Sequence, residues 1–202
     1  MDIDTLNPEI IKELNVAFNE AKLLGAELDT ARRMVAITFS LIMVDEEGHV
    51  PDDTRIQVIL YPVGQLCASL RNGEWNDPDA QIVPFQPEQL LDIIISFGGL
   101  HIYGWDFFDC EENEELIWKD KISMNYENGT DGKTHTLHIF QHGPGRTLDM
   151  HISFDNIKFF TPDYSEIPIT EVAKTGRRGW DALYSGNKNV QNHYQIFPIN
   201  KS

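Results

Sequence analysis

The sequence predicts an α+β protein with a single domain, residues 1–202. It is expected to be mainly an antiparallel β-sheet of about five to seven strands, with two or three helices packed on one face. Two hairpin-like stretches, 33–62 and 134–160, alternate apolar and polar residues, which is typical of strands with one wet face. Apolar residues recur at helical spacing in 8–24, residues 170–184 are interpreted as a further helix, and no linker rich in Pro or Ser divides the chain.

Three helices follow from this spacing and from residues that start or stop helices. They are about 8–24, a segment that begins at Pro87 and ends at Gly98-Gly99, and 170–184. Asn7 can cap the first helix, Pro8 suits its first position, and Gly25 can end it. In the last helix Gly176 and Gly179 allow another element to pack closely. Residues after 186 are predicted to be irregular.

The strands are predicted from period-two alternation bounded by turn residues. They cover 35–43, a return strand at 55–61, a further strand at 65–70, then 118–126, the hairpin 134–154 and a last strand at 157–160. The stretch 102–115, rich in aromatic and acidic residues, has no assigned element. The hairpins 33–62 and 134–160 are each followed by a connection and a helical segment, which suggests a weak internal duplication, although their alignment fails within a few positions.

The charge balance limits the partners. The chain has 32 Asp and Glu against 16 Lys and Arg, a formal net charge of −16, which disfavours nucleic acid and membrane surfaces. Acidic clusters lie at 45–53 and 106–115, either as solvated loops or as a docking face for a basic protein partner. The acidic start and the lack of a long apolar run predict a cytoplasmic protein with both cysteines reduced.

The preferred function is a non-catalytic, acidic interaction module, such as an immunity-like or inhibitor protein that docks a basic partner. Its candidate binding residues are Tyr103, Trp105, Asp106, Phe107, Asp109 and Glu111. Aromatic anchors inside an acidic rim are typical of interfaces, while core packing is the alternative explanation of the aromatics. No local catalytic motif is present, which favours a protein that is not an enzyme. A homodimeric structural subunit, joined through a strand edge or the aromatic segment, is a further alternative.

Four of the seven histidines fall in the hairpin 134–154. A turn at Gly143–Arg146 pairs His138 with His151 and Phe140 with Asp149, and separates polar from apolar side chains cleanly. The candidate metal ligands on the polar face are His138, His142, Asp149 and His151. They could hold Zn²⁺ or another divalent metal, or serve a hydrolytic enzyme as acid and base. The alternatives are the solvent-facing side of an ordinary sheet and a buried, hydrogen-bonded histidine pair.

The segment Gly176-Arg177-Arg178-Gly179-Trp180 is a third feature. Two arginines beside a tryptophan could bind an anion or stack on a ligand. Arginines on a helix more often pair with neighbouring acidic side chains, of which this chain has many. The favoured interpretation is therefore structural.

Overall fold

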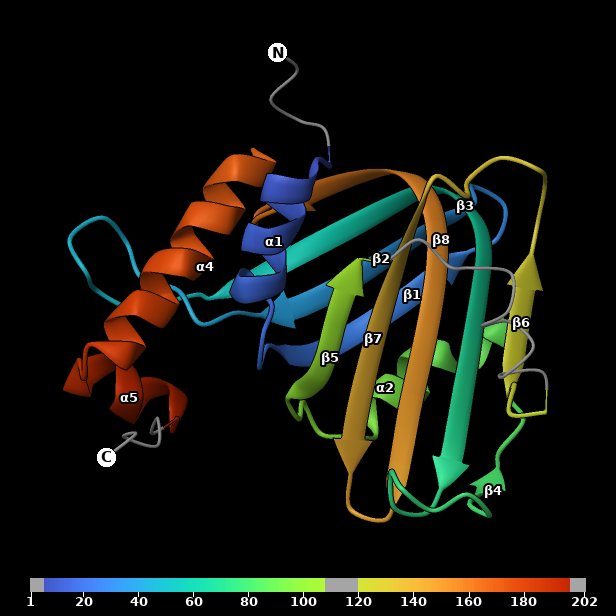
Figure 1. Ribbon diagram of the computed structural model, residues 1–202. Coiled ribbons are helices and arrows are strands. Elements are labelled where there is room, and N and C mark those ends of the chain that lie inside the picture. Colours follow the sequence, from blue (N-terminus) through green and yellow to red (C-terminus); the bar gives the residue numbers. More distant parts are fainter. Residues whose placement is uncertain (1–5, 108–119, 197–202) are drawn as a thin grey trace.

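A computed structural model describes residues 6–107 and 120–196, with the backbone alone for 104–107 (Figure 1). The described strands are β1 (Lys22–Asp29), β2 (Met34–Ser40), β3 (Arg55–Asn72), β4 (Gln81–Ile82), β5 (Ile102–Phe107), β6 (Met124–Glu127), β7 (His135–Gly143), β8 (Arg146–Phe160) and β9 (Glu166–Ile167). The described helices are α1 (Pro8–Ala17), α2 (Leu90–Ile95), which follows a 3₁₀ turn at Pro87–Gln89, α4 (Ile169–Tyr184) and α5 (Lys188–Tyr194). The α+β class with a large antiparallel sheet is confirmed.

The predicted element counts were too low. The described residues form nine strands and four α-helices instead of five to seven strands and two or three helices. Strands β4 and β9 have two residues each and β6 has four, so they are too short to show a period-two pattern. Helix α5 has seven residues and occupies the tail that was expected to be irregular, with the Asn187 side chain accepting hydrogen bonds at its first turn.

The sheet is antiparallel and strongly curved. Its order is β1-β2-β3-β8-β7-β5, with β4 and β6 on β3 and β9 on β8. Strand β3 is 18 residues long and merges two predicted strands, with a register shift between Val63 and Gln65. The two outer strands approach each other where Lys22 bridges His101. As a result β1 and β2 cross behind β7 and β8, and the apolar core fills the space between them (Figure 1).

The predicted first helix is too long. It begins at Pro8 as expected, capped by the Asn7 side chain, but ends at Ala17. Glu20 then takes a positive φ of 55°, and the next residues form β1. Residues 18–24 fit helical spacing in sequence, but Ala21 O accepts a hydrogen bond from Ile102 N at 2.8 Å, so a contact distant in sequence fixes them as extended chain.

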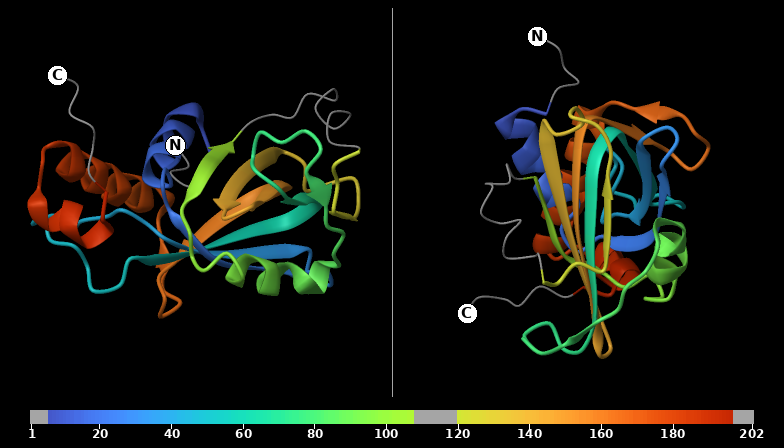
Figure 2. Two further views of the ribbon diagram at one scale, coloured as in Figure 1. Left: turned by 90° about the horizontal axis from the view of Figure 1, so that it is seen from below. Right: turned by 90° about the vertical axis from the view of Figure 1, so that its right-hand side faces the viewer.

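The helices do not all lie on one face as expected. Figure 2 shows α4 and α5 beside one end of the sheet, with α2 across its apolar side. Helices α1 and α4 approach so closely that a Cβ on Gly176 would lie 2.3 Å from Ala17 Cβ, which confirms close packing at this glycine. No helix in residues 6–107 or 120–196 combines the length and apolarity that a bilayer crossing requires.

Candidate metal centre on the outer sheet face

The hairpin of β7 and β8 has the register predicted from sequence. His138 is opposite His151, Phe140 opposite Asp149, and Gly143 opposite Arg146. Gly145 has a φ of 66°, the sign that a Pro-Gly type II turn requires at this position. The apolar residues of the hairpin are buried, namely Leu137, Ile139, Leu148, Met150 and Ile152. His138, Asp149 and His151, which alternate with these apolar residues, therefore lie on the outer face of the sheet.

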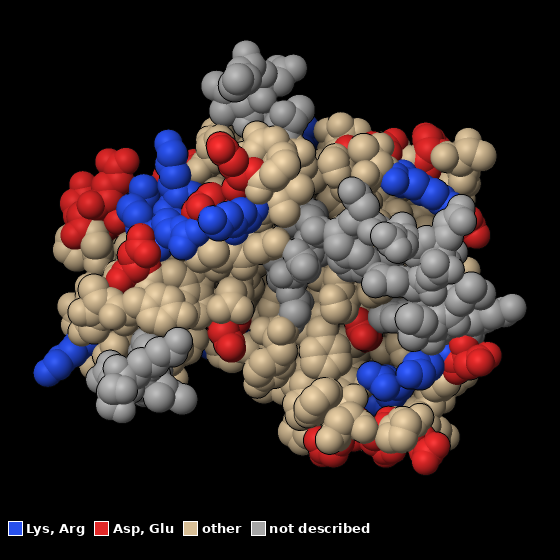
Figure 3. All heavy atoms as spheres, viewed as in Figure 1, with Lys and Arg blue, Asp and Glu red and all other residues tan. Residues whose placement is uncertain are grey.

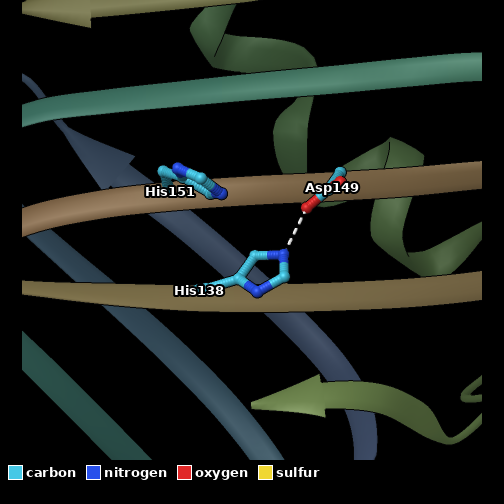
Figure 4. Close-up of side chains that lie close together, drawn as sticks. All are labelled: His138, Asp149 and His151. Atoms are coloured by element: carbon cyan, nitrogen blue, oxygen red, sulfur yellow. Dashed lines mark hydrogen bonds and ion pairs between the residues drawn. The ribbon is translucent and has the colours of Figure 1, made fainter. Parts of the chain in front are cut away.

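Three of the four predicted metal ligands come together on this face. One donor atom from each of His138, Asp149 and His151 lies within 4.8 Å of the others. His138 and His151 pack edge to face, with ring centroids 4.8 Å apart. Figure 4 shows the three side chains on adjacent strands, with α2 behind the sheet. A pair of strands thus places two imidazoles and a carboxylate together without any turn or loop contributing.

A short hydrogen bond joins two of these groups. His138 Nε2 lies 2.6 Å from Asp149 Oδ1, and since an ionised carboxylate only accepts, the imidazole donates. The side chain of His138 is 29% exposed and that of Asp149 is 19% exposed. The pair is therefore partly shielded from water but open to an incoming ion.

The third group is held neutral. Burial lowers the pKa of the His151 imidazole from its ordinary value near 6.5 to about 4, the proximity of His138 adds to the lowering, and Asp149 opposes it. His151 is thus uncharged at neutral pH. A neutral imidazole keeps a lone pair on one ring nitrogen, which is the form that binds metals.

The donor set fits zinc. Three protein ligands of nitrogen and oxygen type, with one position left open, are typical of catalytic zinc sites. Ligand atoms around tetrahedral zinc lie roughly 3.3 Å apart, so the most separated donors here must close by about 1.5 Å. Side-chain rotation can supply that shift. An ion bound at His138 Nε2 would displace the proton that this nitrogen donates to Asp149.

His142, the fourth predicted ligand, lies apart from the other three. It is four residues farther along β7 than His138 and is opposite Thr147. Its Nε2 is 3.3 Å from Glu74 Oε2, and its ring packs at 6.3 Å from that of Tyr103. The structure therefore groups His142 with the loop after β3 rather than with the cluster.

Sequence reasoning missed the residues of β3 that flank the cluster on the other side of β8. Strand β3 pairs with β8 so that Cys67 is opposite His151 and Ser69 is opposite Asp149. This pairing joins positions about 80 residues apart in the chain. Alternation within 65–70 predicted a strand there, but it could not indicate that β8 would be its neighbour.

The candidate docking residues fall partly outside the described structure. Tyr103 is 62% exposed at the start of β5. Trp105, Asp106 and Phe107 lie on the same strand, where the register places Asp106 opposite His138. Asp109 and Glu111 lie outside the described residues. The prediction that these residues bind a partner stays a prediction.

Acidic side chains on the described surface are interspersed with basic ones. Ion pairs join Asp53 to Arg55 at 2.6 Å and Asp131 to Arg33 at 2.8 Å. Figure 3 shows the same intermingling on one face of the molecule. The arrangement offers no added support for docking of a basic protein, which therefore remains a prediction from composition.

The two arginines near the C-terminal end have structural partners. Arg177 forms two hydrogen bonds with Glu13 on α1, at 2.7 and 2.9 Å. Arg178 pairs with Glu171 at 3.2 Å on its own helix. Their favoured structural role is confirmed.

Comparison with known protein families, with curated proteins and with solved structures finds no match for this chain.

The neutral state of His151 makes stability depend on pH. Because the folded-state pKa is about 4, the unfolded chain binds more protons on this residue between pH 4 and 6.5, so stability rises with pH across that window. The full shift corresponds to about 3 kcal/mol, and the partial exposure of the ring reduces this to about 1–2 kcal/mol.

Urea unfolding with EDTA present should show this rise in the wild-type protein between pH 4.5 and 6.5. In His151→Gln the free energy of unfolding should rise by about 1–2 kcal/mol less over this pH range than in the wild type. His142→Gln should show the same rise as the wild type. If the free energy of unfolding changed with pH equally in the wild type and H151Q, His151 would not be neutral in the folded protein.

Proposed function

We propose that this protein binds a divalent transition-metal ion, Zn²⁺ first among them, through His138, Asp149 and His151. The observation that carries the proposal is the convergence of three donor atoms within 4.8 Å on adjacent strands. Support also comes from the low pKa of His151, since burial keeps this imidazole in the form that coordinates metals. Imidazole and carboxylate ligands together favour zinc over calcium and magnesium, which prefer oxygen alone.

Calorimetric titration of metal-free protein with Zn²⁺ tests the proposal. We expect one ion per chain, and we expect the double variant H138A/H151A to bind at least about 100-fold more weakly, because only one of three ligands remains. Titration with Co²⁺ gives a second readout, since its visible absorption reports the coordination geometry. A tetrahedral spectrum is expected for the wild type and not for the double variant.

His142→Ala is the matched control. It removes an imidazole from the same face of the same hairpin, but one that pairs with Glu74 rather than with the cluster. Zinc affinity within about threefold of wild type is expected. If H142A loses as much affinity as the double variant, or if the double variant binds zinc normally, the cluster is not the metal site.

A further inference from the structure

A second group of polar atoms lies on the same face of the sheet, beside the metal cluster. Ser69 is 3% exposed and Thr147 is fully buried, and neither hydroxyl has a hydrogen-bond partner among the described side chains and backbone. The Nε of Arg71 is also buried without a partner. Buried polar atoms are nearly always hydrogen-bonded in native proteins, so three such atoms on one face point to a missing partner.

The register connects these atoms to the cluster. Ser69 on β3 is directly opposite Asp149 on β8. Arg71 is directly opposite Thr147, two residues from Asp149 along β8. Diagonal neighbours of this kind lie about 7–8 Å apart, which the long arginine side chain can span. A small ligand that contacted the two hydroxyls and the guanidinium would therefore lie beside an ion held by the cluster.

Arg71 differs from the other described arginines in the partners of its charged group. Arg32, Arg33, Arg55, Arg177 and Arg178 each pair with a carboxylate, and Arg146 lies over the ring of Phe97. Among the side chains that the structure describes, in residues 6–103 and 120–196, Arg71 has no such counter-ion or ring. A guanidinium without a counter-ion beside two hydroxyl groups favours an anion.

We infer that Arg71, Ser69 and Thr147 form a subsite for a tetrahedral oxyanion such as phosphate. When a metal ion is bound at the cluster, one oxygen of the anion also contacts that ion. This part of the inference rests on the proposed metal function. Arg71 donates to two oxygens, and each hydroxyl donates to one. With the metal, these donors exceed what the two oxygens of a carboxylate can accept, but they suit the four oxygens of phosphate.

Calorimetric titration with inorganic phosphate in 150 mM NaCl tests the subsite, first on metal-free protein and then on protein loaded with one equivalent of Zn²⁺. We expect phosphate to bind both forms, at least about tenfold more tightly when zinc is present. Arg71→Gln should weaken phosphate binding at least about tenfold in both forms and leave zinc affinity within about threefold of wild type. The double variant S69A/T147V, which keeps the charge, should weaken phosphate binding by a smaller factor.

Arg32→Gln is the control, because it removes an exposed arginine that pairs with Asp29 within its own turn. It should bind phosphate as the wild type does. Equal phosphate affinity in R71Q and wild type would overturn the inference, as would a failure of phosphate to bind either form. Acetate that binds as tightly as phosphate would also overturn it, since a planar anion would then suffice.

The two proposals can fail separately. Zinc binding without phosphate binding overturns the subsite and leaves the metal function intact. The opposite result is that phosphate binds the metal-free protein, R71Q abolishes this binding, and zinc does not bind. It supports the subsite and overturns the metal function.

Discussion

Replacing Gly179 by Ala is expected to lower the free energy of unfolding by at least about 3 kcal/mol. A Cβ at this position would lie 2.3 Å from the carbonyl oxygen of Ile42 and 2.8 Å from Met43 Cα. Both are backbone atoms, which cannot move aside as a side chain can. Helix α4 must therefore shift away from the segment after β2, and the contacts of buried Trp180 and Leu183 weaken with it.

The sign of the effect makes this test decisive. In the interior of a helix, Gly→Ala stabilises by up to about 1 kcal/mol when nothing opposes the methyl group. Urea unfolding should show destabilisation instead. Lys174→Ala, at an exposed position of the same helix, serves as the control and should change stability by less than about 0.5 kcal/mol. A G179A protein as stable as the wild type would mean that α4 does not contact Ile42 in this way.

The hairpin that carries the candidate site could be predicted because local information determines it. The Pro-Gly pair fixes the turn, and alternation on either side favours the register that buries Leu137, Ile139, Leu148, Met150 and Ile152 together. His138 and His151 therefore face each other as predicted. The same reasoning predicted the close packing of Gly176, since a glycine on a buried helix face indicates a nearby neighbour.

Features that depend on distant pairing could not be predicted in this way. The first helix was extended to residue 24 because its spacing continues, but the bridge between Lys22 and His101 fixes that stretch as strand. In the same way, Ser69 and Arg71 join the candidate site only because β3 pairs with β8. Sequence periodicity reports which face of a strand is buried, but not which strand lies beside it.

The position of that β3–β8 pairing depends on a bend in β3, and Gly132 holds the bend. The register of β3 shifts between Val63 and Gln65. Beside this shift, Gly64 N donates to Gly132 O at 3.0 Å, and Gly132 N donates to an Asp155 carboxylate oxygen at 3.0 Å. Through these two hydrogen bonds, Gly132 links the turn before β7 to both β3 and β8. This turn lies at the end of the sheet where β7, one of the two strands that carry the cluster, begins.

Gly132→Ala is therefore expected to cost at least about 3 kcal/mol of unfolding free energy. Gly132 has a φ of 76°, and a left-handed conformation costs a residue with a Cβ about 1–2 kcal/mol. The added Cβ would also lie 2.5 Å from Gly64 N and 2.7 Å from Pro62 O, so the turn must move away and lose its hydrogen bond to Gly64.

Gly48→Ala separates the two contributions to this cost. Gly48 has a φ of 84°, but a Cβ there would meet nothing within 4 Å, so only the conformational cost of about 1–2 kcal/mol is expected. Urea unfolding of both variants gives the difference directly. If G132A costs no more than G48A, the turn does not press against β3, and the bend that brings Ser69 and Arg71 beside the histidine cluster must have another cause.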